Sequence, residues 1–469
     1  MRRRRTTRHA LGVLLGSLLP FAPGVSSAQP VDIPPTWGGD FWDRPRLTGS
    51  WWGLRDDLGK KGVVLDTDLL LTPQGVSGGK NTAAEFWGNA EYTLNVDTQK
   101  LGLWPGGFLK VSGQTSFGTS VNEDSGALVP VNVATMIPDL DNNTSGLTNL
   151  TFTQFLSRQF GLFAGKIFLV DGFQGEFAGN YRTQFMNTAL AFPITAALMP
   201  LSAYGGGVVV IPWEALILSA MAVDPSGTIT NNDISEAFDD GAMVIAGAKL
   251  TIKPFGLVGH QGFGGMWSNK SRLSLEQDPS NIARLLLQER FPRLADPGPP
   301  LTRFLQRFRP DLLTPTQPPN REDTSWFVYY SFDQYFWHPG GDQTRGIGMF
   351  FNFGASDGKA NPIKYSFVTG IGGKGVVPGR PHDSFGVGWA RTEVSGNFVP
   401  FLRDTFNLGL GTGDTVEMYY NAAVTQWLSA SLDLQILNPV IKKTVSSGGG
   451  GVKDIDTGIV VGARMYVRF

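Results

Sequence analysis

Charged and polar side chains recur in this sequence in a pattern suited to the recognition of hydroxyl-rich molecules. In several segments a charged residue occupies alternate positions between apolar or small residues. These residues are Asp66, Asp68, Glu91, Lys110, Lys166, Glu417, Asp433 and Arg464. A second group, lying between residues 171 and 201, consists of Glu176, Tyr181, Arg182, Gln184, Phe185 and Asn187. Arg and Glu form charge-assisted hydrogen bonds with hydroxyl groups, and an aromatic ring offers a flat apolar face. These residue types therefore support non-covalent recognition of a polar solute.

The residue types that most often carry catalysis or bind metals are sparse. Cysteine is absent, and the chain contains 4 histidines in 469 residues. His260, His338 and His382 lie in segments rich in glycine and proline, far apart in the sequence. No Asp or Glu accompanies them at the spacing of a metal site or a catalytic pair. We therefore expect ordinary turn histidines, no catalytic residue, no metal, no other cofactor and no enzyme activity.

The alternation of residue types itself predicts β-strands. In residues 457–469 an almost purely apolar row that includes Ile459, Val461 and Val467 alternates with a row that includes Arg464 and Arg468. A period of two places the two rows on opposite faces of a strand. The same pattern predicts about sixteen strands. They lie near residues 63–71, 86–97, 109–117, 150–158, 162–170, 205–211, 216–224, 241–252, 259–267, 326–334, 346–353, 363–371, 385–391, 416–425, 428–437 and 458–469.

Loop lengths indicate that these strands form a transmembrane antiparallel β-barrel. The predicted connections alternate between short ones, such as 159–161 and 426–427, and long ones, such as 122–149 and 171–201. Membrane barrels have short periplasmic turns, long external loops, an apolar outer face and a polar lumen. A soluble sandwich has no reason to sort its loops in this way. Within the longest connection, residues 271–323, apolar residues at helical spacing among arginines predict a helical or irregular external insertion.

Composition and the amino-terminal segment agree with export to a membrane. Charged residues make up 17% of the chain and the net charge is −1, which argues against a nucleic-acid partner. Arginines at positions 2–5 precede a short apolar run and a small-residue cleavage site, so residues 1–28 are predicted to be a cleavable signal peptide. Residues 29–62 are predicted to form a periplasmic lead-in with a short capped helical turn, and residues 63–469 the barrel.

Several short motifs, in this order, resemble the carbohydrate-selective porins of the OprB family. They are Trp-Gly-Leu-Arg at 52–55, Leu-Trp-Pro-Gly-Gly at 103–107, Asp-Gln-Tyr at 333–335, Pro-Gly-Arg-Pro at 378–381 with Asp383, Glu-Met-Tyr-Tyr at 417–420, and Gln435 with Asn-Pro at 438–439. The resemblance spans most of the chain after the predicted signal peptide. A final strand ending in Phe469 also resembles the insertion signal of outer-membrane barrels.

The resemblance implies an outer-membrane porin for passive, selective diffusion of monosaccharides and small oligosaccharides, assembled as a monomer or a homotrimer. We expect loop 171–201 to fold into the lumen and form the constriction. Its residues Glu176, Tyr181, Arg182 and Gln184, together with the charged wall residues, are the candidate site. The wall charges could alternatively do no more than solvate a wide pore. The alternatives are a porin for other small nutrients, such as organic acids, and an outer-membrane barrel enzyme, such as a phospholipase. A secreted adhesin is not supported, because it would not require the loop pattern or the terminal Phe469.

Overall fold

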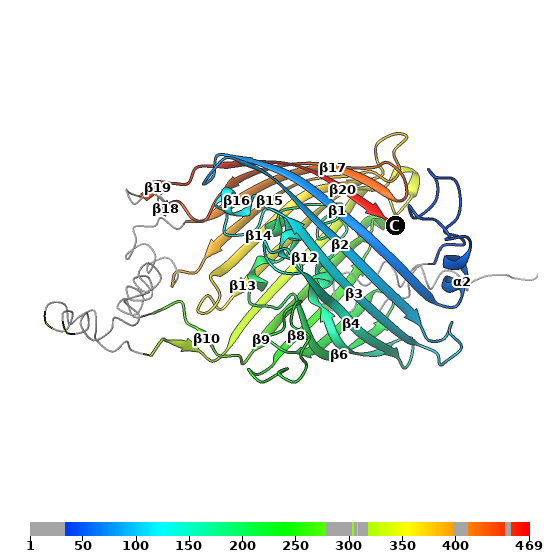
Figure 1. Ribbon diagram of the computed structural model, residues 1–469, viewed down its shortest axis with the longest axis horizontal. Helices are drawn as coiled ribbons and strands as arrows, with labels where there is room; N and C mark the ends of the chain where they lie inside the picture. The colour runs from blue at the N-terminus through cyan, green and yellow to red at the C-terminus, as the bar shows by residue number, and fades with distance from the viewer. Residues whose placement is uncertain (1–32, 278–302, 304–306, 308–317, 398–410, 446–451) are drawn as a thin grey trace, which may run out of the picture.

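The computed structural model describes residues 33–277, 303, 307, 318–397, 411–445 and 452–469. Within this part of the chain, sixteen antiparallel strands form one closed barrel, as the sequence predicts (Figure 1). The barrel strands are β1 (Val63–Ser77), β2 (Ala83–Asp97), β3 (Gly107–Gly118), β4 (Ser145–Phe155), β5 (Phe160–Phe168), β6 (Ser202–Trp213), β7 (Leu216–Val223), β8 (Met243–Ile252), β9 (Gly259–Ser268), β12 (Ser325–Trp337), β13 (Gly346–Ser356), β14 (Ile363–Lys374), β15 (Ser384–Val394), β16 (Gly413–Ala423), β17 (Leu428–Asn438) and β20 (Gly458–Arg468).

Side-chain alternation explains which face of each strand points outward. On β2, Glu91 points into the lumen and Tyr92 lies on the outer face, where it is largely exposed. On β20, Val461 is exposed on the outer face while Arg464 is buried inside. Each predicted strand is present, with its ends shifted by a few residues. The strand expected near 150–158, for example, is Ser145–Phe155.

The first and last strands close the barrel. β20 pairs with β17 on one side and with β1 on the other, where Asp68 lies opposite Arg468. The backbone N–H of Phe469 donates to the carbonyl oxygen of Thr67 at 2.8 Å. Closure leaves no unpaired strand edge, which is the condition for a sheet to be stable in lipid.

The two ends of the barrel differ in loop length, as predicted. At one end, here called the short-turn end, the connections include 156–159, 214–215 and 424–427. At the opposite, long-loop end they include 119–144, 169–201 and 224–242, while 78–82 and 357–362 are exceptions that are short.

The connection between β9 and β12 begins and ends as a two-stranded ribbon of β10 (Arg272–Leu273) and β11 (Arg321–Glu322). The expected helices of the 271–323 insertion fall almost wholly outside the described residues. A second small ribbon, β18 (Lys443–Val445) with β19 (Val452–Asp454), lies in the connection between β17 and β20. The predicted signal peptide, residues 1–28, is also outside the described part.

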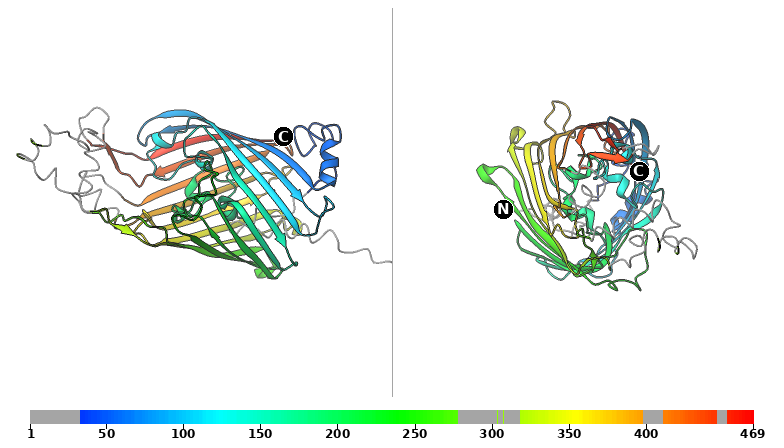
Figure 2. Two further views of the ribbon diagram at one scale, coloured as in Figure 1. Left: turned by 60° about the horizontal axis from the view of Figure 1, so that its bottom comes forward. Right: turned by 90° about the vertical axis from the view of Figure 1, so that its left-hand side faces the viewer.

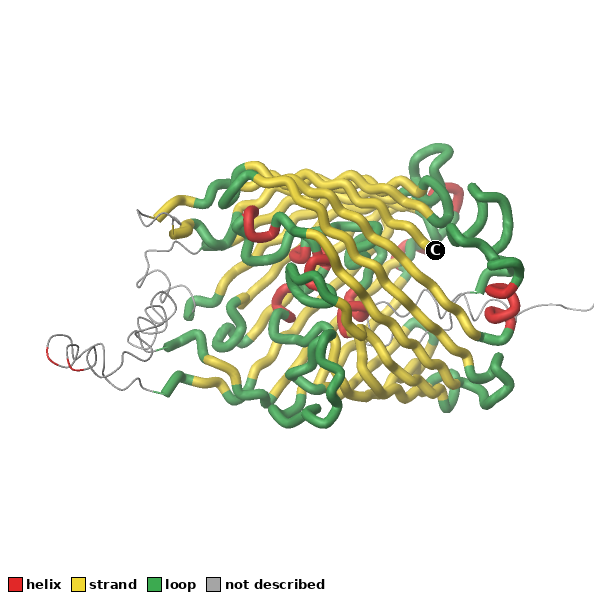
Figure 3. Tube along the Cα trace, viewed as in Figure 1, coloured by secondary structure: helices red, strands yellow, loops and turns green. Residues whose placement is uncertain are grey.

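The lead-in before β1 contains helix α2 (Leu54–Lys60) at the short-turn end (Figure 3). The helix follows Gly53, whose φ of 92° is a left-handed conformation that glycine adopts without strain. No side chain caps its first turn, so the capped turn expected from the sequence is a helix without a side-chain cap. None of the helices in the described ranges is long and apolar enough to cross a membrane.

Two long loops fold back into the barrel instead of projecting from it (Figure 2). Loop 169–201 contains η3 (Leu169–Phe173), α4 (Thr188–Ala191) and η4 (Ile194–Ala196). This inward fold confirms the expected constriction loop. Loop 119–144, with α3 (Asn122–Ser125) and η2 (Val133–Met136), also enters the lumen, which the sequence analysis did not anticipate. The backbone N–H of Val133 donates to the carbonyl oxygen of Met186 at 2.9 Å and joins the two loops. The short 3-10 turns η5 (Pro254–Gly256) and η8 (Pro339–Gly341) lie in connections at the short-turn end.

Glycines on the lumen wall make room for the apolar residues of loop 169–201. A Cβ atom at Gly372 would lie 2.7 Å from Phe177 Cβ, and one at Gly386 would lie 2.8 Å from Phe185 Cζ. Phe185 is fully buried, and its ring packs against Tyr419 at 4.8 Å between centroids. The loop is therefore seated on a wall that is shaped for it, and the resulting apolar contacts hold it inside the barrel.

Candidate pore constriction

Loop 169–201 bounds a cavity of about 1210 Å³ inside the barrel. The cavity extends from the short-turn end, at Trp42 and Arg468, to loop residues Glu176 and Arg182. Its lining is mixed in charge and polarity. The loop and the strand walls each contribute to it, so the site is made of residues that lie far apart in the sequence.

Three ion pairs join the loop to the wall around this cavity. Arg182 pairs with Glu91 on β2. On β3, Lys110 Nζ lies 3.1 Å from Asp171 Oδ2. On β14, Lys374 Nζ lies 2.8 Å from Glu176 Oε2. All six side chains line the cavity.

Arg182 is held on two sides. Its guanidinium contacts the Glu91 carboxylate and lies 4.6 Å from the centroid of the Tyr181 ring. Burial opposes the charge of Arg182, but the Glu91 carboxylate, together with smaller effects of Tyr181, Tyr466 and Asp171, outweighs burial, so the pKa of the guanidinium lies well above its ordinary value. Arg182 therefore presents a fixed cation to the cavity, as a group that donates directed hydrogen bonds must.

Glu176, another residue of loop 169–201, is held in its charged carboxylate form. It accepts hydrogen bonds from Lys374 Nζ at 2.8 Å and from the Tyr335 hydroxyl at 3.0 Å. Burial would raise its pKa, but the Lys374 ammonium and these hydrogen bonds outweigh burial and hold the pKa at about 2. Gln184 fixes the loop around this residue, because its side-chain amide donates to the carbonyl oxygen of Glu176 at 2.9 Å.

Two predicted wall residues, Arg464 and Glu417, bind the backbone of the loop and are not among the cavity-lining residues. Arg464 donates to the carbonyl oxygens of Tyr181 and Gln184, both at 2.7 Å. Glu417 accepts from the backbone N–H groups of Met186 at 2.5 Å and Asn187 at 3.0 Å. Both wall side chains are buried. They hold the loop in position, and the buried ring of Tyr181 packs against the Arg182 guanidinium.

Lys166 lies apart from the constriction. Its ammonium donates to the carbonyl oxygens of Ile229 at 3.1 Å and Asn231 at 2.8 Å, and to Asn232 Oδ1 at 2.6 Å. It therefore anchors loop 224–242 at the long-loop end. The cavity-lining residues do not include Lys166.

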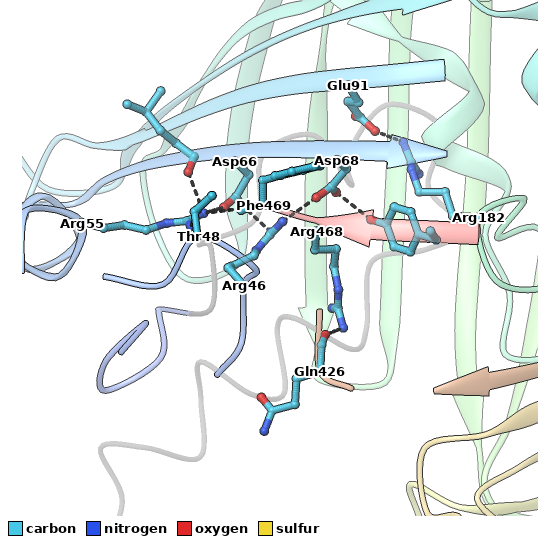
Figure 4. A network of polar contacts seen from close by, with 12 residues as sticks. Arg46, Thr48, Arg55, Asp66, Asp68, Glu91, Arg182, Gln426, Arg468 and Phe469 are labelled. Atoms are coloured by element: carbon cyan, nitrogen blue, oxygen red, sulfur yellow. Dashed lines mark hydrogen bonds and ion pairs between the residues drawn. The ribbon is translucent and has the colours of Figure 1, made fainter. Parts of the chain in front are cut away.

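Asp66 and Asp68 belong to a polar network at the short-turn end (Figure 4). Arg46 lies between them, 2.8 Å from Asp66 Oδ2 and 2.5 Å from Asp68 Oδ1. Arg55 of α2 reaches Asp66 at 2.6 Å and the carbonyl oxygen of Phe469 at 3.1 Å. Asp68 also lines the cavity, whereas Asp66 serves to fasten the lead-in to the barrel seam.

The expectation that His260 is a turn histidine without a carboxylate partner is wrong. His260 lies on β9, and its Nδ1 is 2.6 Å from Asp333 Oδ1 on β12. These two residues lie directly opposite each other in the strand register and are both buried. Sequence spacing did not reveal the pair because its members are 73 residues apart. His338 does lie in a turn, where its Nδ1 is 2.7 Å from the Arg345 carbonyl oxygen.

Asp171 and Lys374 also line the cavity and form two of its ion pairs, but neither is among the site residues expected from the sequence. Lys374 ends β14 on the alternating inward row, so extending that strand by three residues would have identified it. No group of three or more His, Asp or Glu side chains that could hold a metal ion occurs among the residues that the structure describes.

Comparisons with known proteins agree with the barrel fold. Porin B of Pseudomonas aeruginosa is 28% identical over 142 residues, which cover 28% of this chain and 29% of that protein. The fold matches a solved structure titled the high pH structure of Pseudomonas putida OprB with a TM-score of 0.73 and 21% identity, over 92% of this chain and all of that one. The low pH structure of the same protein matches with a TM-score of 0.54 and 17% identity, over 91% of this chain and 99% of that one. The model of the carbohydrate-selective porin, OprB family, matches residues 81–469. The chain therefore belongs to the carbohydrate-selective porin, OprB family.

Proposed function

We propose that the protein is an outer-membrane porin through which neutral monosaccharides and small oligosaccharides diffuse passively. The observation that carries this proposal is the balance of charge where loop 169–201 meets the cavity wall. The three anions Glu91, Asp171 and Glu176 are each paired with one of the three cations Arg182, Lys110 and Lys374. These six residues, here called the rim, together have a net charge of zero and exert little long-range field on ions. The rim still presents many hydrogen-bonding groups to a solute that carries hydroxyls.

In this proposal the constriction is built from three kinds of residue. The ion-paired residues Glu91, Lys110, Glu176 and Arg182 contact the passing solute. Tyr181, Gln184, Glu417 and Arg464 position the loop that carries Glu176 and Arg182. Asp68 contacts solute at the short-turn end, while Asp66 and Lys166 fasten other segments to the barrel.

The proposed placement in the cell follows from the family and the closed barrel. Residues 1–28 direct export and are removed, the short-turn end faces the periplasm, and the lead-in 29–62 lies on that side. The outer face of the strands contacts outer-membrane lipid. The long loops that leave the barrel face the cell exterior.

Liposome swelling with purified protein tests the proposal. Liposomes that contain the protein are placed in isotonic glucose, maltose, gluconate or an amino acid of similar size. We expect glucose and maltose to enter faster than the charged and zwitterionic solutes. Faster entry of gluconate than of glucose would instead show a porin for organic acids, and equal rates for all solutes of one size would show a non-selective pore.

A further inference from the structure

Trp42 is an aromatic residue that lies exposed in the lumen of the barrel. Its side chain is 65% exposed and lines the large cavity at the short-turn end. Tyr92 on β2 and Phe263 on β9 are also exposed, but they lie on the outward faces of strands. Lipid covers those rings, but it does not reach Trp42. An indole left in water forgoes the stabilisation that burial of its apolar surface would bring.

The backbone around Trp42 is fastened on both sides. Phe41 packs edge-on against Trp427 at 5.0 Å between centroids, and the Trp427 indole donates to the Phe41 carbonyl oxygen at 2.8 Å. On the other side, Arg46 is bound by two carboxylates of β1, and the N–H of Leu47 donates to the Arg468 carbonyl oxygen at 2.8 Å. The Trp42 ring itself is in edge contact with Phe41 at 5.2 Å. The backbone that carries the ring is therefore fixed before any ligand arrives, which reduces the entropic cost of binding one.

Polar residues line the same cavity as this ring. Asp43, Gln426 and Arg468 are among them, and the Arg468 guanidinium donates to the Gln426 carbonyl oxygen. No hydrogen bond joins the Trp42 indole N–H to another of the described residues. An aromatic face beside a carboxylate, an amide and a guanidinium matches the two surfaces of a sugar ring, which has apolar C–H groups on one face and hydroxyls around its edge.

The position of this cluster places it in series with the constriction. One cavity of about 1210 Å³ joins Trp42 to Arg182. This volume exceeds the roughly 300–1,000 Å³ of a typical small-molecule site, so the cavity has room for a monosaccharide at the inward loop and for another at Trp42. A solute that leaves the constriction toward the periplasm enters the cavity that Trp42 lines.

We propose that Trp42 and Asp43, with Gln426 and Arg468, form a second saccharide subsite at the periplasmic exit of the pore. This inference rests on the proposed sugar diffusion and specifies where a sugar binds after the constriction. The pyranose ring stacks on the Trp42 indole, and Asp43 accepts a hydrogen bond from a hydroxyl group. The subsite is selective for a cyclic sugar over an open-chain polyol, because only the ring presents a flat face to the indole.

Sugar-induced block of single-channel current tests the subsite. Wild type, Trp42→Ala and Trp42→Phe are compared in planar bilayers, with glucose or its open-chain counterpart sorbitol added to one side at a time. Trp104→Ala is the control, because Trp104 lies in a turn at the same end of the barrel, is 49% exposed and is not among the cavity-lining residues. All variants are first checked for heat-modifiable migration, so that folded barrels are compared.

We expect Trp42→Ala to weaken the block by glucose added from the periplasmic side about threefold to tenfold, as for the loss of one aromatic contact. Block by glucose added from the extracellular side should change less than that. Trp42→Phe should restore most of the effect, Trp104→Ala should behave as wild type, and the preference for glucose over sorbitol should fall in Trp42→Ala alone.

Two results would overturn the subsite, and they have different meanings. If glucose blocks wild type and Trp42→Ala equally from both sides, the indole binds no sugar, while the proposed sugar porin stands. If glucose blocks neither protein, and liposome swelling shows no preference for sugars, both proposals are wrong.

Discussion

The guanidinium of Arg182 reaches across the lumen from a loop to the carboxylate of Glu91 on strand β2, 91 residues earlier in the chain. The two opposite charges thus form one ion pair in the cavity wall (Figure 4). Replacement of either residue therefore changes both the net charge and the shape of the rim.

Arg182→Ala should leave Glu91 as an uncompensated anion at the constriction. We expect a larger conductance, a shift toward cation selectivity, and an affinity for glucose about tenfold to a hundredfold lower, since a hydrogen bond from a charged donor contributes roughly 1.5–3 kcal/mol. Reversal potentials in a salt gradient and glucose titration of the current measure these effects. The double change Glu91→Gln with Arg182→Ala should restore the selectivity but not the glucose affinity. Unchanged block by glucose would show that solute selection occurs elsewhere.

Arg464→Met should release loop 169–201 from the wall. Arg464 is buried and holds two loop carbonyl oxygens at 2.7 Å, and its removal also leaves buried acidic neighbours without a cation. Breaking a buried ionic group of this kind typically costs about 3–5 kcal/mol. We expect noisier and larger single-channel currents and new protease cleavage within 176–187, with the barrel still heat-modifiable. Lys166→Met, which frees a different loop, is the matched control and should leave the conductance unchanged.

Acidification should loosen the same loop through Glu176. The pKa of its carboxyl group in the folded protein, about 2, lies below the ordinary value of 4.5. The Glu176 carboxyl group thus binds a proton more readily in the unfolded or released loop than in the folded protein. The stabilisation is complete above pH 4.5 and is lost as pH falls toward 2. The Glu176 carboxyl group is bound directly by Lys374 and Tyr335. His260 and Asp333 also lie around Glu176.

Single-channel noise measured between pH 6 and pH 2, about two units either side of that ordinary carboxyl value, checks this expectation. Glu176→Gln should be noisy already at neutral pH and should respond less to acid than wild type. If the two proteins respond identically, other carboxyl groups account for the change.

Arg55→Met should destabilise the seam between the first and last strands. Arg55 donates to the carbonyl oxygens of Leu65 at 2.9 Å and Phe469 at 3.1 Å, and pairs with Asp66. We expect the temperature of heat-modified migration to fall, whereas Lys60→Met, which removes only an exposed ion pair on the same helix, should have almost no effect. Deletion of Phe469 should impair assembly more than Val461→Ala on the outer face of β20. Equal assembly yields would contradict a role for the final residue.

The strands could be predicted from the sequence because the alternation of apolar and polar residues is visible within each strand alone. Val461 and Arg464 reveal the two faces of β20 without knowledge of any partner. The constriction was predicted only in outline. Arg182 was identified by residue type, but its pairing with Glu91 depends on how a loop of more than thirty residues folds back, and no local pattern encodes that path.

Strand register and close packing account for the other missed features. His260 and Asp333 meet because β9 and β12 pair in one particular register, which one sequence alone does not specify. Gly372 and Gly386, which face the lumen, did indicate that a loop packs against the wall. Glycines in a lumen-facing row leave space beside the wall, and here Phe177 and Phe185 fill that space.

The contact of Arg55 with both Leu65 and Phe469 also bears on how the barrel is made. One guanidinium bonds to the first strand of the barrel and to the residue that follows its last strand. The bond to Phe469 can exist only after the two ends of the sheet have met. In an open sheet Arg55 could still contact Leu65 and Asp66, which are both on β1. The lead-in is therefore fully fastened only to a closed barrel, and closure adds to the stability of a segment that lies outside the sheet.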